Sequence, residues 1–76
     1  MDAQIFLGLK YGKLILTLAE VATELGMEVG TAHNQISAGT FPIPTTKRGK
    51  NRVADLRDLA EYIDNQREQS KLAFNA

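Results

Sequence analysis

The residues best suited to chemistry in this sequence are cations gathered in one short stretch. The whole chain has nine Lys and Arg against nine Asp and Glu, so its formal net charge is zero. No Asp or Glu occurs from Val29 to Ala54, however, and four of the nine cations fall inside that interval. Cations gathered in this way neutralise phosphates, and the released counterions give an affinity for nucleic acid that does not depend on sequence. The four cations are Lys47, Arg48, Lys50 and Arg52.

A second group of polar side chains precedes the cations and is suited to contacting bases. Val29, Ala32 and Ile36 recur at helical spacing and predict a helix over Val29–Ala38. The side opposite them offers an Asn, which can bond bidentately to adenine, and a Thr, which can meet a base edge or a thymine methyl group. The alternative is a polar helix face that only meets water. The candidate DNA-contacting residues of this helix are Gly30, Thr31, His33, Asn34 and Ser37.

Metal and enzyme chemistry have no support in the sequence. His33 is the only histidine and the chain has no cysteine, so we expect no metal site. A single histidine near a core edge more often packs and hydrogen-bonds there, and a phosphate contact is the alternative. There is no set of nucleophile, histidine and acid, and no glycine loop to cradle a phosphate. We therefore expect neither an enzyme nor a cofactor.

The candidate helix belongs to a stretch, Thr17–Gly39, that predicts two short helices joined by a tight turn. Thr17 is an N-cap candidate, with Glu20 at the capping-box spacing. Gly26 stands where the first helix would end, because glycine adopts the left-handed conformation of a sharp turn, and Gly39 closes the second helix. Such a pair is a helix-turn-helix, whose second helix can enter a DNA major groove, although other small helical proteins contain it too. The apolar stripe of the first helix is Leu18, Val21, Ala22 and Leu25.

The cations fall on a predicted β-hairpin. Residues before proline favour extended conformations, and proline confines a strand to a sheet edge, so Ile43–Thr46 is predicted as an edge strand with Asn51–Ala54 as its partner. Lys47–Lys50 would form the turn, with Gly49 supplying a positive φ. Asn51, next to this turn, joins the cations as a candidate DNA contact. A hairpin in this place is the wing of a winged helix-turn-helix, which would contact the DNA backbone. An ordinary solvated hairpin tip is the alternative.

An additional helix is predicted before the helix-turn-helix. Asp2 would cap it, Ala3–Tyr11 would form it and Gly12 would end it, after which Lys13–Leu16 would be extended. We expect this helix to pack over the core, with a partner contact as the alternative. Its apolar side is predicted to carry Ile5, Phe6 and Leu9.

A last helix is predicted after the hairpin. Asp55 is its N-cap candidate, and we expect it to fray near Gln69. Its acidic side is expected to be solvated. The chain is thus predicted to be one α+β domain, mainly α, over residues 1–76, with the architecture of a winged helix-turn-helix. The apolar stripe of the last helix is Leu56, Leu59, Ala60 and Ile63.

The stretch LTLAEVATELGMEVGTAHNQISAGTFPIP resembles the compact winged helix-turn-helix of phage excisionases and of AlpA and MerR-like regulators. A closer resemblance is to the pyocin activator family, PrtN. It is carried by YGKLILTLAEVA, GTFPIPT and VADLRDLAEYIDNQR and spans Tyr11 to Arg67. The resemblance implies a small prophage- or bacteriocin-associated activator that binds DNA boxes upstream of its target genes. Two departures are the lack of Lys and Arg in the second helix, and Glu28 where the usual cap is Ser or Thr.

The expected partner is double-stranded DNA, and an activator would add RNA polymerase as a second candidate. An excisionase-like factor that bends DNA for a recombinase is the first alternative function, and a protein-binding module is the second. A domain with few cations should bind DNA weakly alone, so we expect a homodimer or a cooperative oligomer, with contacts through Ile5, Phe6, Leu72 and Phe74. No leader opens the chain and no apolar run could span a bilayer, so we expect a cytoplasmic, nucleoid-associated location without membrane contact.

Overall fold

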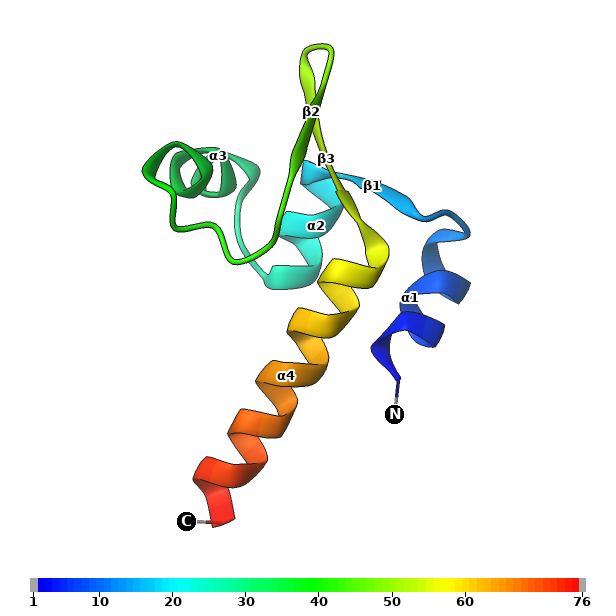
Figure 1. Cartoon of the computed structure of the whole chain (residues 1–76), viewed down its shortest axis with the longest axis vertical. Helices are drawn as coiled ribbons and strands as arrows, with labels where there is room; N and C mark the ends of the chain where they lie inside the picture. Colours follow the sequence, from blue (N-terminus) through cyan, green and yellow to red (C-terminus); the bar gives the residue numbers. More distant parts are fainter. Residues whose placement is uncertain (1, 76) are drawn as a thin grey trace.

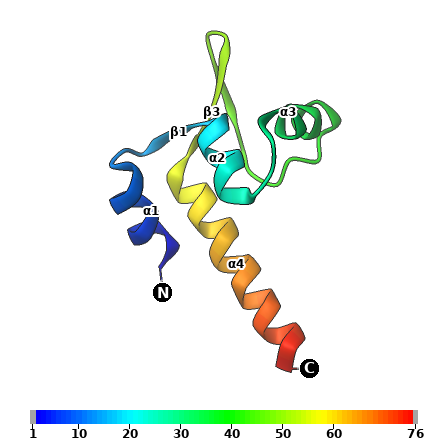
Figure 2. The same cartoon turned by 180° about the vertical axis from the view of Figure 1, so that it is seen from behind.

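The computed structural model describes residues 2–75, which form four helices and three strands. The strands make one antiparallel sheet in the order β1-β3-β2. The predicted α+β, mainly helical fold of the winged helix-turn-helix type is therefore confirmed. Figure 1 shows α3 and the β2–β3 hairpin at one end of the molecule and the C-terminal part of α4 at the other, and Figure 2 shows the same arrangement from behind. The elements are α1 (Ala3–Tyr11), β1 (Ile15–Thr17), α2 (Leu18–Leu25), α3 (Val29–Ala38), β2 (Thr46–Arg48), β3 (Asn51–Asp55) and α4 (Leu56–Asn75).

The ends of the helix-turn-helix are set by the residues that the sequence indicated. The Thr17 hydroxyl accepts a hydrogen bond from the Glu20 N–H at 3.1 Å, and Glu20 Oε1 accepts one from the Thr17 N–H at 2.9 Å, which completes the capping box of α2. Gly26 and Gly39 end α2 and α3 with φ of 74°, a left-handed conformation that glycine adopts without steric cost. Glu28 precedes α3 without making a side-chain cap bond, so α3 begins less firmly than α2.

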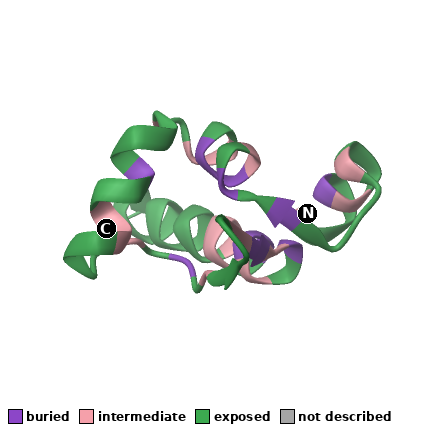
Figure 3. Cartoon of the chain, turned by 90° about the horizontal axis from the view of Figure 1, so that it is seen from above, coloured by how far each residue is buried: buried purple, intermediate pink, exposed green. Residues whose placement is uncertain are grey.

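The core lies where α1, α2 and the first half of α4 meet the sheet. Leu16, Val21 and Leu59 are fully buried there, and Ala32 joins α3 to α2 in a smaller apolar cluster with Leu18. The predicted stripes of α2 and α4 are thus confirmed, with Leu25 and Ile63 half-buried at their ends. Viewed from above in Figure 3, buried residues occupy short stretches of an otherwise exposed ribbon. Most of α3 and of the hairpin therefore remains accessible.

The sheet has one strand more than the predicted two-stranded hairpin. The segment before α2 was predicted only as extended, but Ile15–Thr17 pairs with β3, with Leu16 opposite Ala54 and Thr17 opposite Val53. The added strand follows from burial, because Leu16 and Ala54 lie on one face of the sheet and both are enclosed by the core. Strand β3 is therefore central, and it holds the hairpin against the beginning of α2.

The first strand of the hairpin lies further along the chain than predicted. The expected strand Ile43–Thr46 is wrong, because the observed strand is Thr46–Arg48, paired with Val53, Arg52 and Asn51 in turn. Prolines 42 and 44 have no N–H to donate to a strand partner, and Ile43 between them is buried in the core with 3% exposure. Pairing consequently starts after the last proline. The turn contracts to Gly49, with φ of 60°, and Lys50.

The two outer helices also differ from expectation. Helix α1 packs beside α4 through Leu7, with Ala3 and Tyr11 on the same side. The prediction that Ile5, Phe6 and Leu9 form its packing side is wrong, since all three are exposed. The expected fraying of α4 near Gln69 is wrong too, because the helix continues to Asn75. Neither glycine nor proline follows Gly49, and most residues after position 65 favour helix.

Candidate nucleic-acid interface

The outer face of α3 carries all of the candidate DNA-contacting residues that were predicted for this helix. This face, called here the α3 outer face, is exposed at all five of its positions. The opposite side is anchored by Ala32, which is fully buried, and by half-buried Ile36. Val29 was predicted to share that inner side, but it is 43% exposed because it begins the helix before the contact with α2. The α3 outer face comprises Gly30, Thr31, His33, Asn34 and Ser37.

The hairpin carries its cations on both faces. Paired residues of antiparallel strands lie on the same side of the ribbon and successive residues on opposite sides. The pair Arg48 and Asn51 thus occupies one face and the pair Lys47 and Arg52 the other, with Lys50 in the turn. The hairpin therefore carries positive charge on both of its faces. The predicted turn over Lys47–Lys50 is wrong, because Lys47 and Arg48 belong to β2.

Arg52 differs from the other three cations in its environment. Its side chain is half-buried, and Nη1 donates a hydrogen bond to Thr45 Oγ1 at 3.1 Å. Lys47, Arg48 and Lys50 are exposed, and none of them has an acidic partner within 4 Å among residues 2–75. These three are consequently available to an external anion, whereas Arg52 also ties the hairpin to the preceding loop.

A concavity of about 270 Å³ lies between the hairpin, the beginning of α2 and the beginning of α3. It brings His33 of α3 together with Lys50, Asn51 and Arg52 of the hairpin, although 17 or more positions separate them in the chain. Asn34, Thr31 and Ser37 do not line it. Four further lining residues were not among the predicted site residues. They are Thr17, Leu18, Ala19 and Val29.

The contribution of α2 was not predicted because the preceding segment was expected to be extended but without a partner strand. The capping box fixes where α2 begins, but only the pairing of Thr17 with Val53 brings that end beside the hairpin. Ile15, Leu16 and Thr17 show no alternation of apolar and polar residues, and the only local signal for this strand is the β-branched pair Ile15 and Thr17, which is too short to be decisive.

Of the two acids nearest to the interface, Glu20 is paired with a cation and Glu28 has no such pair among residues 2–75. Glu20, in the first turn of α2, lies 3.0 Å from Lys13 Nζ. The Thr17 N–H, and to a lesser degree Lys13, lower the pKa of this carboxyl, so it is charged and paired at neutral pH. Glu28 is exposed at the start of α3. Apart from it, α3 and the hairpin carry one acid, Asp55 at the base of β3, since none occurs from Val29 to Ala54.

Two other kinds of site were sought within the described part of the chain. Across residues 2–75, no group of three or more His, Asp or Glu side chains is arranged to hold a metal ion. In the same range, no helix combines the length and apolar character needed to cross a membrane.

Comparison with protein families found a match to the family described as pyocin activator protein PrtN, over residues 6–70. The matched range includes both helices of the helix-turn-helix, the whole hairpin and most of α4. Neither curated proteins nor solved structures gave a match.

Proposed function

The chain belongs to the pyocin activator family, PrtN, and on this premise we propose that it is a transcription activator that binds specific duplex DNA. Helix α3 would enter the major groove, and the hairpin would contact the flanking phosphates. The DNA boxes would lie upstream of bacteriocin or prophage genes, and RNA polymerase would be the second partner.

The single observation that carries this proposal is the union of two exposed surfaces at one end of the molecule. The α3 outer face offers side chains that can contact base edges, and the adjoining hairpin offers three cations without acidic partners among residues 2–75. Base contacts give specificity, while phosphate contacts give position and general affinity. The concavity shared by His33 and Lys50 links these two surfaces.

Small residues on α3 favour close approach to a groove. Gly30 and Thr31 are exposed in its first turn, and Asn34 follows one turn later on the same side. An α-helix fits the major groove of B-DNA, and an asparagine there can bond bidentately to adenine N6 and N7. We assign Asn34 as the main base-contacting residue and Thr31 as its neighbour in the groove.

The test compares the effect of one substitution, Asn34→Ala, on the affinity for two DNA duplexes. Asn34→Ala should weaken binding to the duplex upstream of the chain's own gene by about 1–3 kcal/mol, roughly 5- to 150-fold, because a bidentate base contact is lost. It should leave binding to a scrambled duplex of equal length unchanged, since a base contact adds no general affinity. Fluorescence anisotropy at fixed salt measures both affinities.

Two control variants separate specificity from folding. Asn65→Ala makes the same chemical change on the exposed surface of α4 and should leave both affinities unchanged. Ile36→Ala leaves a cavity in the small apolar cluster between α2 and α3, so it should lower thermal stability and weaken binding to both duplexes equally. Equal loss on both duplexes for Asn34→Ala would contradict its role in base contact. An absence of DNA binding by the unaltered chain would favour the protein-binding alternative.

A factor that bends DNA for a recombinase would use the same interface, and the affinity measurement does not separate it from an activator. Transcription from the upstream promoter in a reconstituted reaction does, because only an activator raises transcript yield. A bent duplex without increased transcript would favour the excisionase-like alternative.

A further inference from the structure

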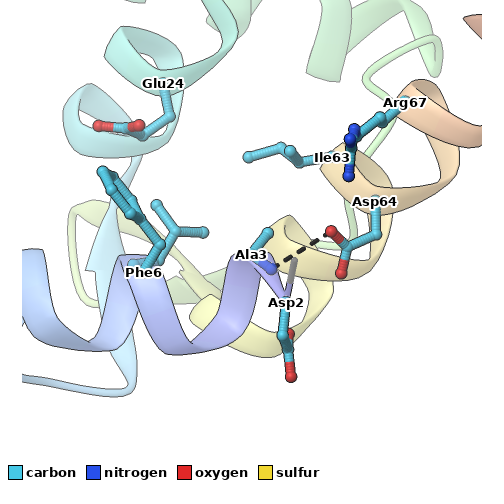
Figure 4. Close-up of a pocket in the computed structure, with 8 residues that line it drawn as sticks. Asp2, Ala3, Phe6, Glu24, Ile63, Asp64 and Arg67 are labelled. Atoms are coloured by element: carbon cyan, nitrogen blue, oxygen red, sulfur yellow. Dashed lines mark hydrogen bonds between the residues drawn. The ribbon is translucent and has the colours of Figure 1, made fainter.

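An apolar groove lies between α1 and α4, away from the hairpin. This α1–α4 groove has a volume of about 570 Å³, with Phe6 and Ala3 on one wall and Ile63 on the other. Figure 4 shows Ile63 extending toward α1, with Glu24 beyond it and Asp64 and Arg67 at the near edge. The Ala3 N–H donates a hydrogen bond to Asp64 Oδ1 at 3.2 Å, which fixes the two helices on either side of the opening.

Helix α4 continues far beyond the body that forms this groove. Every residue from 65 to 75 is exposed, yet all of them are helical. Successive positions on the side of Ile63 are Arg67, Ser70 and Phe74, because residues at intervals of three and four share a face. Phe74 is 90% exposed. The face that packs into the core at the start of α4 therefore ends in an aromatic side chain with no contact surface in its own chain.

We propose that a second copy of the chain occupies the α1–α4 groove, by inserting its Phe74 beside Ile63 and Phe6. Ile63 and Phe74 are separated by about 16 Å along the helix, from the rise of 1.5 Å per residue. Two antiparallel α4 tails that cross midway between Arg67 and Ser70 bring Phe74 of each copy level with Ile63 of the other. Both contacts form together, so the dimer closes with twofold symmetry.

Charge complementarity favours this occupant. Three carboxylates line the groove, those of Asp2, Glu24 and Asp64, and two cations offset them, Arg67 in the groove and Lys10 paired with Glu24 at 2.6 Å, so one negative charge remains. The Glu24 pKa is lowered mainly by hydrogen bonds from Lys10 and Tyr11, so its carboxylate is charged at neutral pH. The only charged residue after Glu68 is Lys71, one turn before Asn75. The α4 tail thus brings an aromatic anchor and a cation to an apolar groove with an acidic rim.

The arrangement also accounts for the helical tail. Three helical turns without packing are only marginally stable in water, and contact with a second copy would stabilise them. The hairpin and α3 lie at the opposite end of the molecule (Figure 1), so this contact leaves them uncovered. The inference goes beyond the proposed function and does not depend on it.

The test is sedimentation equilibrium of the full chain without DNA. The unaltered chain should associate to a dimer as concentration rises, and Phe74→Ala should raise the dimer dissociation constant at least tenfold. Leu72→Ala is the matched control, because Leu72 lies on the same tail about 200° around the helix and is 63% exposed. It should change the constant less than twofold. Both substitutions leave the core intact, so thermal unfolding at low concentration should be unchanged.

A second pair of variants tests the groove itself. Phe6 and Ile5 are equally exposed on α1, at 57% and 59%, but only Phe6 lines the groove. Phe6→Ala should weaken the dimer and Ile5→Ala should not, and combining Phe6→Ala with Phe74→Ala should weaken it by less than the product of the single effects. A chain that stays monomeric would overturn the proposal. So would equal effects of Phe74→Ala and Leu72→Ala, or of Phe6→Ala and Ile5→Ala.

Discussion

The two lysines of the hairpin give the sharpest test of its contact with DNA. Lys47 and Lys50 are exposed and have no acidic partner among residues 2–75, so each is free to neutralise one phosphate. Each lost phosphate contact reduces the slope of log K against log salt by about 0.9, so Lys47→Ala with Lys50→Ala should make it shallower by about 1.8. Over a rise from about 50 to about 200 mM salt, the unaltered chain should therefore lose about tenfold more affinity than the double variant.

The control for this measurement removes the same charge from another part of the molecule. Lys10 and Lys13 form surface ion pairs with Glu24 and Glu20, at 2.6 and 3.0 Å, and such pairs add little stability. Replacing both with alanine changes net charge by the same amount and should leave the salt slope unaltered. Fluorescence anisotropy on scrambled duplex DNA, repeated at five salt concentrations, gives both slopes. Equal slopes for the two double variants would refute a specific hairpin contact and leave only the effect of net charge.

Two further predictions follow from ionisable groups outside the interface. The Arg57 side chain and then its N–H hold the Asp55 pKa at about 2, so Asp55 contributes stability above pH ~4 that is lost as the pH falls toward 2. Between about pH 4 and pH 2 the thermal midpoint of Asp55→Asn should therefore fall less than that of the unaltered chain. An equal fall in the two proteins would contradict the pairing of Asp55 with Arg57. Burial, and then the hydrogen bond to Glu24, raises the Tyr11 pKa to about 12, so its contribution holds below pH ~10 and is lost between pH 10 and 12. Between about pH 10 and pH 12 the thermal midpoint of Tyr11→Phe should fall less than that of the unaltered chain. An equal fall in the two proteins would count against the hydrogen bond between Tyr11 and Glu24.

The helix-turn-helix could be predicted in detail because its signals are local. Thr17 and Glu20 act within one turn, and Gly26 and Gly39 act at single positions, so no distant residue is needed to place these ends. The strands could not be placed in the same way. Ile43 before Pro44 was predicted to begin the edge strand, but its side chain is buried in the core and its backbone is not paired. Which residues of such a segment join a sheet depends on tertiary burial.

The features of the site that lie within one segment of the sequence could be predicted, whereas those that depend on contacts between distant segments could not. The absence of acids from Val29 to Ala54 and the polar face of α3 could be read directly from the chain. The half-burial of Arg52 against Thr45 could not, because it depends on where β2 begins. The exposure of Phe6 could not either. The apolar residues of Ala3–Tyr11 could form either of two helix faces. In the structure the face that contains Leu7 packs against α4 and is buried.

The junction of β3 with α4 has a mechanical consequence. The strand ends at Asp55 and the helix begins at Leu56, whose N–H donates to the Leu14 carbonyl at 2.7 Å, while Arg57 grips the Asp55 carboxylate at 3.0 and 2.7 Å. Hairpin and helix are thus joined without a loop between them, so a displacement of β3 passes directly to the start of α4. The first half of α4 is packed in the core and is fixed to α1 by the Ala3–Asp64 hydrogen bond, so the core as a whole resists such a displacement.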